Sequence, residues 1–396
     1  MLKHNKNQLI NCVVTILNIL LAIHSPLFAY AFILLYFLFL SKYIPNFFRV
    51  SNAFILIFSM ALIAASRAYF ETESDDFIRY YDIYYGLLHG NYALLFTFGN
   101  GFEIGLPCFY LILGAFTQVE NPVFVLFCET FFILLFYYIW IEKKVIPYLD
   151  RSRVTILLVS ALFFFSITLA TQLPRQMLSM VFLLYALSST LKKNRLLFLI
   201  LATLTHLSAL PIYLMIKFVR YKPKTAFVCI LGGSIIFLYY SSIIINTINL
   251  YSPDIINRLN YYLVQLDTTK ESDFLMKMNI RAISSLVLIF LGSFLIRSTT
   301  IVNQYKNTLL LFIVLYVILI SFPLASFRLT LIFHSILLGL FMFFIFSKYN
   351  DFYRLFLLFY ILYRILNWSL RIDIENNFRL WESYFWIGYP FHFLLK

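Results

Sequence analysis

The chain has 396 residues, of which 62% are hydrophobic and only 12% are charged, and its 31 Lys and Arg outnumber 18 Asp and Glu to give a formal net charge of +13. A soluble domain is about 45–50% apolar and about 25% charged, so this composition excludes a water-soluble globular enzyme, a disordered chain and a disulfide-built secreted scaffold. Because one membrane-spanning helix needs about 20 apolar residues, we expect an all-α, polytopic integral membrane protein.

Charge-free stretches predict about 11–13 transmembrane or re-entrant helices in a single membrane domain that covers residues 1–396. In chain order, these stretches fall at 8–23, 27–41, 50–67, 102–118, 122–141, 154–173, 175–191, 196–216, 225–248, 281–296, 307–322, 329–347 and 354–368. No cluster of Lys and Arg is long enough to argue for nucleic-acid binding. We therefore interpret the net positive charge as the excess of basic residues expected in cytoplasmic loops.

Three long loops are predicted, near 68–101, 249–280 and 369–383. The first is acidic, whereas the short connections at 142–153 and 217–224 are basic. The positive-inside rule places short basic connections in the cytoplasm. The three long loops are then predicted to lie on the outer, periplasmic side.

This topology is consistent only if two segments enter the membrane and return on the same side. If 102–118 and 122–141 both crossed, the basic connection after them would lie outside, and a single crossing at 196–216 creates the same conflict. Gly105 and Pro107 interrupt the first of these segments, and the stretch from His206 to Pro211 interrupts the second. Irregular backbone at membrane depth is tolerated only where it is buried in protein or lines a cavity, so both segments point to a functional site.

Asp76 is the first candidate site residue, at the edge of the acidic loop. If the surrounding stretch is helical, Asp76, Tyr80 and Tyr84 share one face at four-residue spacing. A carboxylate beside phenols is suited to binding sugar hydroxyls or to acting as a base. The alternative is a solvated interfacial helix that carries its aromatic belt.

Two further carboxylates stand next to or inside apolar segments. Glu103 comes just after Gly99-Asn100-Gly101 and opens a largely charge-free apolar segment, where it could simply stabilise a helix amino terminus. Glu129 has apolar residues on both sides inside 122–141. It pairs with a buried cation or lines a cavity, and the sequence does not name its partner.

Two isolated arginines repeat one pattern. Arg175 follows Pro174 and Arg328 follows Pro323 more distantly, and both stand between charge-free stretches, away from the basic clusters. Arg binds phosphate through a planar fork and stays protonated, so both are candidates to bind a pyrophosphate. The alternative is that the side chains reach to lipid headgroups.

His206 lies within an apolar stretch, beside Thr205 and Ser208, and His334 follows Arg328 by six residues. A lone histidine is usually a satisfied core residue, but ionisable side chains at membrane depth often mark function. Two isolated arginines and a histidine near acidic loops suggest an anionic ligand. The sequence has no nucleotide-phosphate loop, HExxH motif or zinc-ligand spacing, so a nucleotide donor from the cytosol is not expected.

With these residues in place, the chain resembles the EpsG/Wzy-type family of polysaccharide repeat-unit polymerases, which includes many O-antigen polymerases. The resemblance covers residues 70–350 approximately, and its motifs follow one another in order along the chain. They are Asp76 with Tyr80, Phe102-Glu103-x-Gly105, Pro174-Arg175-Gln176, His206-x-Ser208-Ala209-Leu210 and Arg328.

The resemblance implies a glycosyltransferase related to the membrane-embedded C-type enzymes. Such polymerases transfer a glycan from undecaprenyl pyrophosphate to a new lipid-linked oligosaccharide at the periplasmic face of the bacterial inner membrane. A flippase and a chain-length regulator are then expected as partners, besides the lipid bilayer.

The resemblance also implies roles for individual residues. Arg175 and Arg328 would bind the pyrophosphate with assistance from His206, while Asp76 or Glu103 would be the base or orient the acceptor. Because arginines can neutralise the leaving group, no metal or other cofactor is expected, although the Asp75-Asp76 pair leaves a metal open.

The main alternative is a flippase or transporter of lipid-linked oligosaccharide, which needs a similar cationic cavity. Transporters often consist of two related halves, and the sequence shows no internal repeat. A single-sugar glycosyltransferase or a membrane acyltransferase is a third interpretation.

Overall fold

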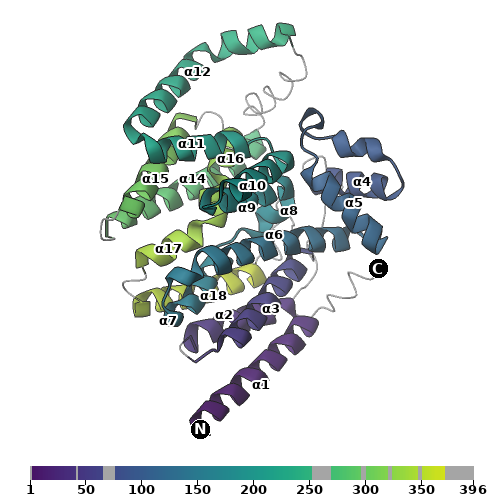
Figure 1. The fold of residues 1–396 in the computed structure, drawn as a ribbon, viewed down its shortest axis with the longest axis vertical. Coiled ribbons are helices and arrows are strands. Elements are labelled where there is room, and N and C mark those ends of the chain that lie inside the picture. Colours follow the sequence, from purple (N-terminus) through teal and green to yellow (C-terminus); the bar gives the residue numbers. More distant parts are fainter. Residues whose placement is uncertain are drawn as a thin grey trace. The chain divides into compact units, whose positions relative to one another are not determined.

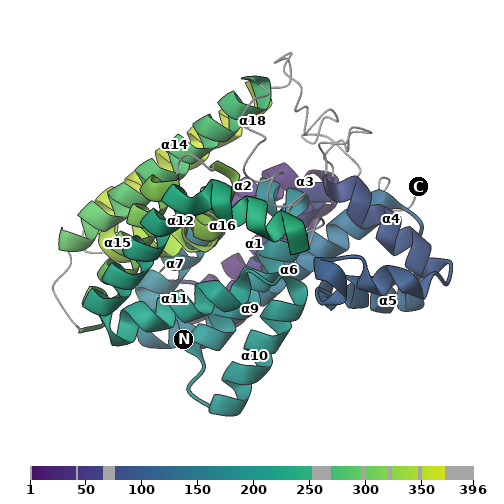
Figure 2. The same cartoon turned by 90° about the horizontal axis from the view of Figure 1, so that it is seen from above.

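The computed structural model describes residues 2–41, 43–65, 76–251, 269–295, 300–319, 323–346 and 350–370, and these residues form helices and connections without any strand. The predicted all-α class is confirmed. Figure 1 and Figure 2 show the helices from two directions. The chain divides into two compact units, one made of residues 1–209 and 346–396 and the other of residues 210–345.

The first unit holds most of the helices. They are α1 (Leu2–His24), α2 (Pro26–Phe39), α3 (Asn46–Ala65), α4 (Asp76–Leu88), α5 (Gly105–Thr117), α6 (Pro122–Lys144), α7 (Arg151–Phe163), α8 (Ile167–Gln172), α9 (Pro174–Ser188), α10 (Lys192–Thr205) and α18 (Asn350–Leu370). Short 3₁₀ turns at Tyr92–Phe96, Gly99–Gly101 and Ile146–Tyr148 lie between them.

The second unit continues from α11 (Ala209–Tyr221). Its further helices are α12 (Pro223–Tyr251), α14 (Thr269–Gly292), α15 (Thr300–Ile318), α16 (Pro323–Leu331) and α17 (Leu338–Phe346), with a 3₁₀ turn at Ser293–Leu295 and a π-helix at Ile332–Ile336.

Several helices have the length or the apolar character of membrane segments. Among the described residues, Asn46–Ala65 and Pro122–Tyr148 are long and apolar enough to cross a membrane. The pair Ser326–Ile336 and Leu338–Phe346, which is bent by 51°, would be a third span if it crosses as one. Shorter apolar helices include Gly105–Thr117. These helices agree with a polytopic membrane protein, while the number of crossings stays a prediction.

The structure corrects two predicted spans, because neither is a single helix. The stretch 154–173 is interrupted after Phe163, and the hydroxyl of Ser166 accepts a hydrogen bond from the amide of Leu169 to begin α8. The stretch 329–347 contains the π-helix and the 51° bend. The predicted interruption at His206 is confirmed, since α10 ends at Thr205 and α11 begins at Ala209.

The predicted outer loops are only partly described. Residues 68–75, 252–268 and 371–383 lie outside the described part of the chain. The remainder of the first loop is mostly helical, since it contains α4 and two 3₁₀ turns. The side of the membrane on which these segments lie, and the single membrane domain, stay predictions.

Two packed groups of helices position the candidate site. A buried cluster that includes Tyr80, Leu106, Tyr110 and Val125 packs α4 against α5 and α6. Helices α9 and α10 lie side by side as a hairpin (Figure 1, Figure 2). The hydroxyl of Ser179 on α9 links the pair by donating to the carbonyl oxygen of Ala202 on α10 at 2.7 Å.

Candidate active site

The amino-terminal half of α4 faces Arg175. The predicted helix begins at Asp76, so Asp76, Tyr80 and Tyr84 follow at four-residue spacing. The hydroxyl oxygen of Tyr80 accepts a hydrogen bond from Nε of Arg175 at 3.3 Å. Asp76 is half-buried and near enough to Arg175 to attract its positive charge. Because Tyr80 itself is buried, this geometry makes it a support for Arg175, and direct contact with substrate stays a prediction.

Tyr84 turns into the core between α4 and α5. Its side chain is fully buried and lies edge-on to the ring of Tyr110. Its hydroxyl donates a hydrogen bond to the carbonyl oxygen of Val119 at 2.6 Å. This geometry favours a structural role for Tyr84. The expected binding of substrate by Tyr84 stays a prediction.

A tight turn before α5 places Glu103. Three consecutive residues adopt positive φ angles, with 57° at Gly99, 54° at Asn100 and 89° at Gly101. A side chain at Gly99 would also collide with Glu103, because a Cβ there would lie 2.5 Å from Cγ of Glu103. Only glycine combines this left-handed backbone with so close an approach. The turn therefore directs the Glu103 side chain inward.

Arg175 stands at the second position of α9, directly after Pro174. Pro is favoured at the first helical position because its φ angle already suits the helix. A cation at a helix amino terminus is disfavoured by the helix dipole, so Arg175 needs compensating contacts. It forms an ion pair with Glu103 through Nη1 and Oε2, and its guanidinium carbon lies 3.7 Å from the ring centroid of Phe98.

His206 lies at the interruption between α10 and α11. Its backbone is extended, with φ −158° and ψ 123°, and Nδ1 of its ring lies 2.7 Å from Oε1 of Glu103. The backbone amide of Leu207 donates to the same oxygen at 2.9 Å. The approach of α5 to this interruption requires glycine at 105, because a Cβ there would lie 2.6 Å from Oγ1 of Thr205.

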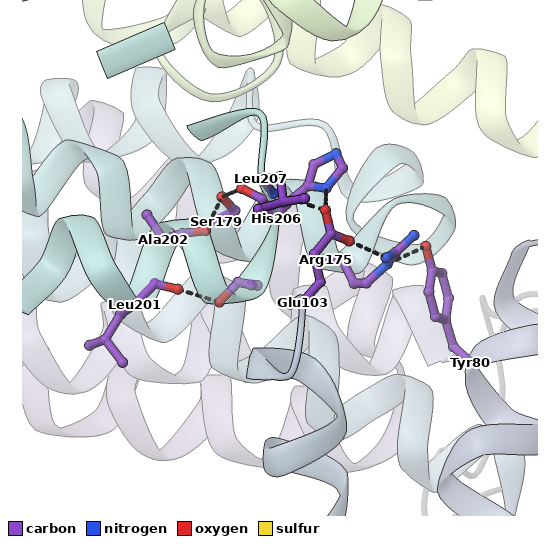
Figure 3. A network of polar contacts seen from close by, with 9 residues as sticks. Tyr80, Glu103, Arg175, Ser179, Leu201, Ala202, His206 and Leu207 are labelled. Atoms are coloured by element: carbon purple, nitrogen blue, oxygen red, sulfur yellow. Dashed lines mark hydrogen bonds and ion pairs between the residues drawn. The ribbon is translucent and has the colours of Figure 1, made fainter. Parts of the chain in front are cut away.

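Glu103 is thus the centre of the site (Figure 3), and its carboxylate accepts from Arg175, His206 and the Leu207 amide. The side chain of Glu103 is 5% exposed, whereas that of Arg175 is 19% exposed and that of His206 is 17% exposed. Three donors around one buried carboxylate favour its charged form. Among the described residues, Nη2 of Arg175 and Nε2 of His206 have no hydrogen-bond partner, so both remain available to a ligand.

The comparison with protein families covers this whole site. The model of the EpsG family matches residues 50–384. The chain belongs to the EpsG family. Membership confirms the resemblance found in the sequence and, with the apolar helices, makes the chain a polysaccharide-polymerase-like membrane protein. No curated protein and no solved structure matches the chain, so the C-type glycosyltransferase fold stays a prediction.

Two predicted cationic residues of this EpsG-family protein belong to the second unit. Arg328 lies in α16, and its cooperation with Arg175 stays a prediction. His334 lies in the π-helix, where its ring nitrogens contact the hydroxyl of Ser335 at 2.8 Å and the carbonyl oxygen of Phe327 at 3.3 Å. These contacts are typical of a satisfied core histidine. The described residues contain no group of three His, Cys, Asp or Glu side chains that could hold a metal ion.

Sequence reasoning missed two parts of the EpsG-family site, the Phe98 ring and the Leu207 amide. Phe98 directly precedes the glycine turn, which is the only local signal for it, and a backbone amide carries no side-chain signal at all. The structure also gives Glu129 a partner that the sequence did not name. The buried hydroxyl of Tyr110 donates to Oε1 of Glu129.

Proposed function

We propose that this protein joins oligosaccharide repeat units linked to undecaprenyl pyrophosphate into O-antigen or exopolysaccharide at the periplasmic face of the inner membrane. The observation that carries the proposal is Arg175, which Glu103, Tyr80 and Phe98 hold at the amino terminus of α9 with Nη2 available. A planar guanidinium at a helix amino terminus is suited to a phosphate ligand. Membership of the EpsG family supports a polymerase that binds its phosphate-containing substrate through this arginine.

The reaction would break the bond between the anomeric carbon of the donor and the pyrophosphate oxygen. The leaving pyrophosphate gains negative charge as this bond breaks, and fixed positive groups stabilise such charge without reorganising at the moment of reaction. Arg175 supplies a positive group of this kind in the first unit. We propose Arg328 as a second positive group for the pyrophosphate. Asp76 and Tyr80 lie on the α4 side of Arg175, where we place sugar residues of the bound units that do not react.

A flippase or transporter of the same lipid-linked oligosaccharide is the alternative. It would use the same cationic contacts to bind the pyrophosphate but would not break the glycosidic bond. Family membership favours the polymerase, and the two functions differ in whether a longer glycan is made.

The experiment gives lipid-linked repeat units to the purified protein in detergent and separates the products on a gel. A ladder of products supports the polymerase, and binding of the units without elongation supports transport. Arg175→Ala should lower the rate of elongation by about 10²- to 10³-fold, the usual cost of removing one donor that stabilises transition-state charge. Arg79→Ala is the matched control, because Arg79 is exposed on α4. Unchanged elongation by Arg175→Ala would remove Arg175 from the site.

A further inference from the structure

The two ring nitrogens of His206 are in different situations. Nδ1 lies 2.7 Å from Oε1 of Glu103, and an ionised carboxylate can only accept a hydrogen bond. Nδ1 must therefore carry a hydrogen. In a neutral imidazole the other nitrogen, Nε2, then holds a lone pair and can accept a proton.

Glu103 is badly placed to be the base itself. Both of its oxygens already accept hydrogen bonds, Oε2 from Arg175 and Oε1 from His206 and the Leu207 amide. Its side chain is also the least exposed of the three, at 5% against 19% and 17%. A proton added to Glu103 would neutralise the carboxylate that pairs with Arg175 and His206.

The backbone around His206 holds the ring in place. The amide of His206 donates to the carbonyl oxygen of Ala202 at 2.9 Å, and Ser179 contacts the carbonyl oxygens of Ala202 at 2.7 Å and of His206 at 3.4 Å. These bonds join the interruption to both α9 and α10 (Figure 3). A ring anchored on one nitrogen by Glu103 and at its backbone by α10 keeps Nε2 in one direction.

We infer that Nε2 of His206 removes the proton from the acceptor hydroxyl, and that Glu103 is the positioning residue that fixes the ring and its tautomer. This inference rests on the proposed function. The hydroxyl oxygen forms the new bond to the anomeric carbon while its proton moves to Nε2. The bond from the anomeric carbon to the pyrophosphate breaks, and its electron pair leaves with the pyrophosphate next to Arg175.

The charges around His206 suit this step. In the first unit, Glu103 faces the ring from the approach to α5, Arg175 lies on the other oxygen of Glu103 from α9, and Tyr80 and Asp76 lie beyond Arg175 on α4. The carboxylate of Glu103 stabilises the imidazolium that forms, as in other carboxylate–histidine pairs that act in catalysis. His206 thereby takes the role that the sequence assigned to Asp76 or Glu103.

The experiment measures the rate of the first transfer, from one lipid-linked unit to another, between about pH 5 and pH 9, where a histidine changes its charge. The rate of the unmodified protein should rise with pH to a plateau, because the base acts in its neutral form. His206→Gln should lower the plateau by about 10²- to 10⁴-fold, the usual contribution of a general base, and should remove the rising limb.

Two further variants separate catalysis from structure. Adding imidazole should restore part of the rate of His206→Ala, more at high pH than at low pH, which a purely structural role does not predict. Glu103→Gln should lower the rate and move the midpoint of the rising limb to lower pH, because a neutral amide stabilises the imidazolium less than a carboxylate does. His89→Ala is the matched control, since His89 lies 3.3 Å from Glu120 in an exposed pair.

Different failures identify different errors. A ladder of normal rate from His206→Gln overturns this inference and leaves the polymerase intact. A rate that falls as pH rises, with the falling limb lost in His206→Gln, makes His206 a protonated donor to the pyrophosphate and also overturns it. No elongation by the unmodified protein at any pH overturns the proposed function instead. Thermal unfolding in detergent identifies any variant that has failed to fold.

Discussion

The first unit contains two arginine–glutamate ion pairs that differ in their hydrogen bonds and in their burial. Arg49 of α3 donates both terminal nitrogens to Glu142 of α6, Nη1 to Oε2 at 2.6 Å and Nη2 to Oε1 at 2.5 Å. Arg175 gives one terminal nitrogen to Glu103, which shares its second oxygen between His206 and Leu207. In the first pair the arginine is the more buried partner, at 7% against 29%, and in the second it is the less buried one, at 19% against 5%.

This difference separates a structural ion pair from a functional one. Both terminal nitrogens of Arg49 donate to one carboxylate, so the pair joins α3 to α6 through a nearly buried arginine. Glu103 instead divides its oxygens, which leaves Nη2 of Arg175 and Nε2 of His206 available among the described residues. An ion pair with unused donors on its exposed side is therefore the better sign of a binding site.

The largest expected difference is between Arg175→Lys and Arg49→Lys. Lysine keeps the charge but loses the planar fork, so Arg175→Lys should lower the rate of elongation by about 10²-fold or more. Arg49→Lys should leave the rate per folded molecule unchanged and lower the free energy of unfolding by about 1–2 kcal/mol. Elongation assays and thermal unfolding in detergent measure the two effects. Equal losses of activity in both variants would contradict the distinction.

Gly105→Ala should have the next largest effect, because it disturbs the site without touching a charged group. The new Cβ would lie 2.6 Å from Oγ1 and 2.9 Å from Cα of Thr205, so the start of α5 must move away from α10 and separate Glu103 from His206. Misplacement of catalytic groups by 1 Å can cost about 10²-fold in rate, and we expect a loss of about 10- to 10²-fold in elongation.

Gly114→Ala is the control on the same helix. A Cβ there would meet Cδ1 of Leu88 at 3.3 Å, which is the end of a flexible side chain, so elongation should change little. If both glycine variants were equally active, the close approach of α5 to α10 would not matter for the site.

Phe98→Leu should have a moderate effect, since it keeps an apolar side chain and removes the ring face under Arg175. The guanidinium carbon lies 3.7 Å from the ring centroid, and a cation over an aromatic ring contributes about 0.5–2 kcal/mol. We expect elongation to slow by about 5- to 10-fold, measured as the initial rate. Phe96→Leu, at an exposed ring nearby, is the control and should retain the normal rate.

Tyr80→Phe should have the smallest effect. It removes one hydroxyl whose oxygen lies 3.3 Å from Nε of Arg175, and a hydrogen bond to a charged group contributes about 1.5–3 kcal/mol at good geometry and less at this length. We expect a loss of about 2- to 5-fold in the initial rate. Tyr85→Phe, at an exposed position on α4, is the control, and a larger loss in the control than in Tyr80→Phe would contradict the role of the hydroxyl.

The amino-acid sequence by itself determined what depends on local composition and spacing. The scarcity of charge predicts helices in a membrane, four-residue spacing predicts the shared face of Asp76 and Tyr80, and the polar residues at His206 predict the interruption of a helix. The same scarcity singles out Glu103 and Arg175, because each stands almost alone among apolar residues. Each of these signals is contained within a few turns of chain.

The tertiary structure alone decided which of these residues meet and what each one does. The three residues Glu103, Arg175 and His206 lie on separate segments. Only the packing of α5 and α9 with α10 brings Arg175 and His206 to the carboxylate of Glu103 (Figure 3). The inward turn of Tyr84 depends in the same way on a distant segment, since its hydroxyl donates to the carbonyl oxygen of Val119. Hydrophobicity and helical periodicity are properties of consecutive residues, whereas the partner of a buried charge depends on packing between distant ones, so the base and its positioning residue could be told apart only in three dimensions.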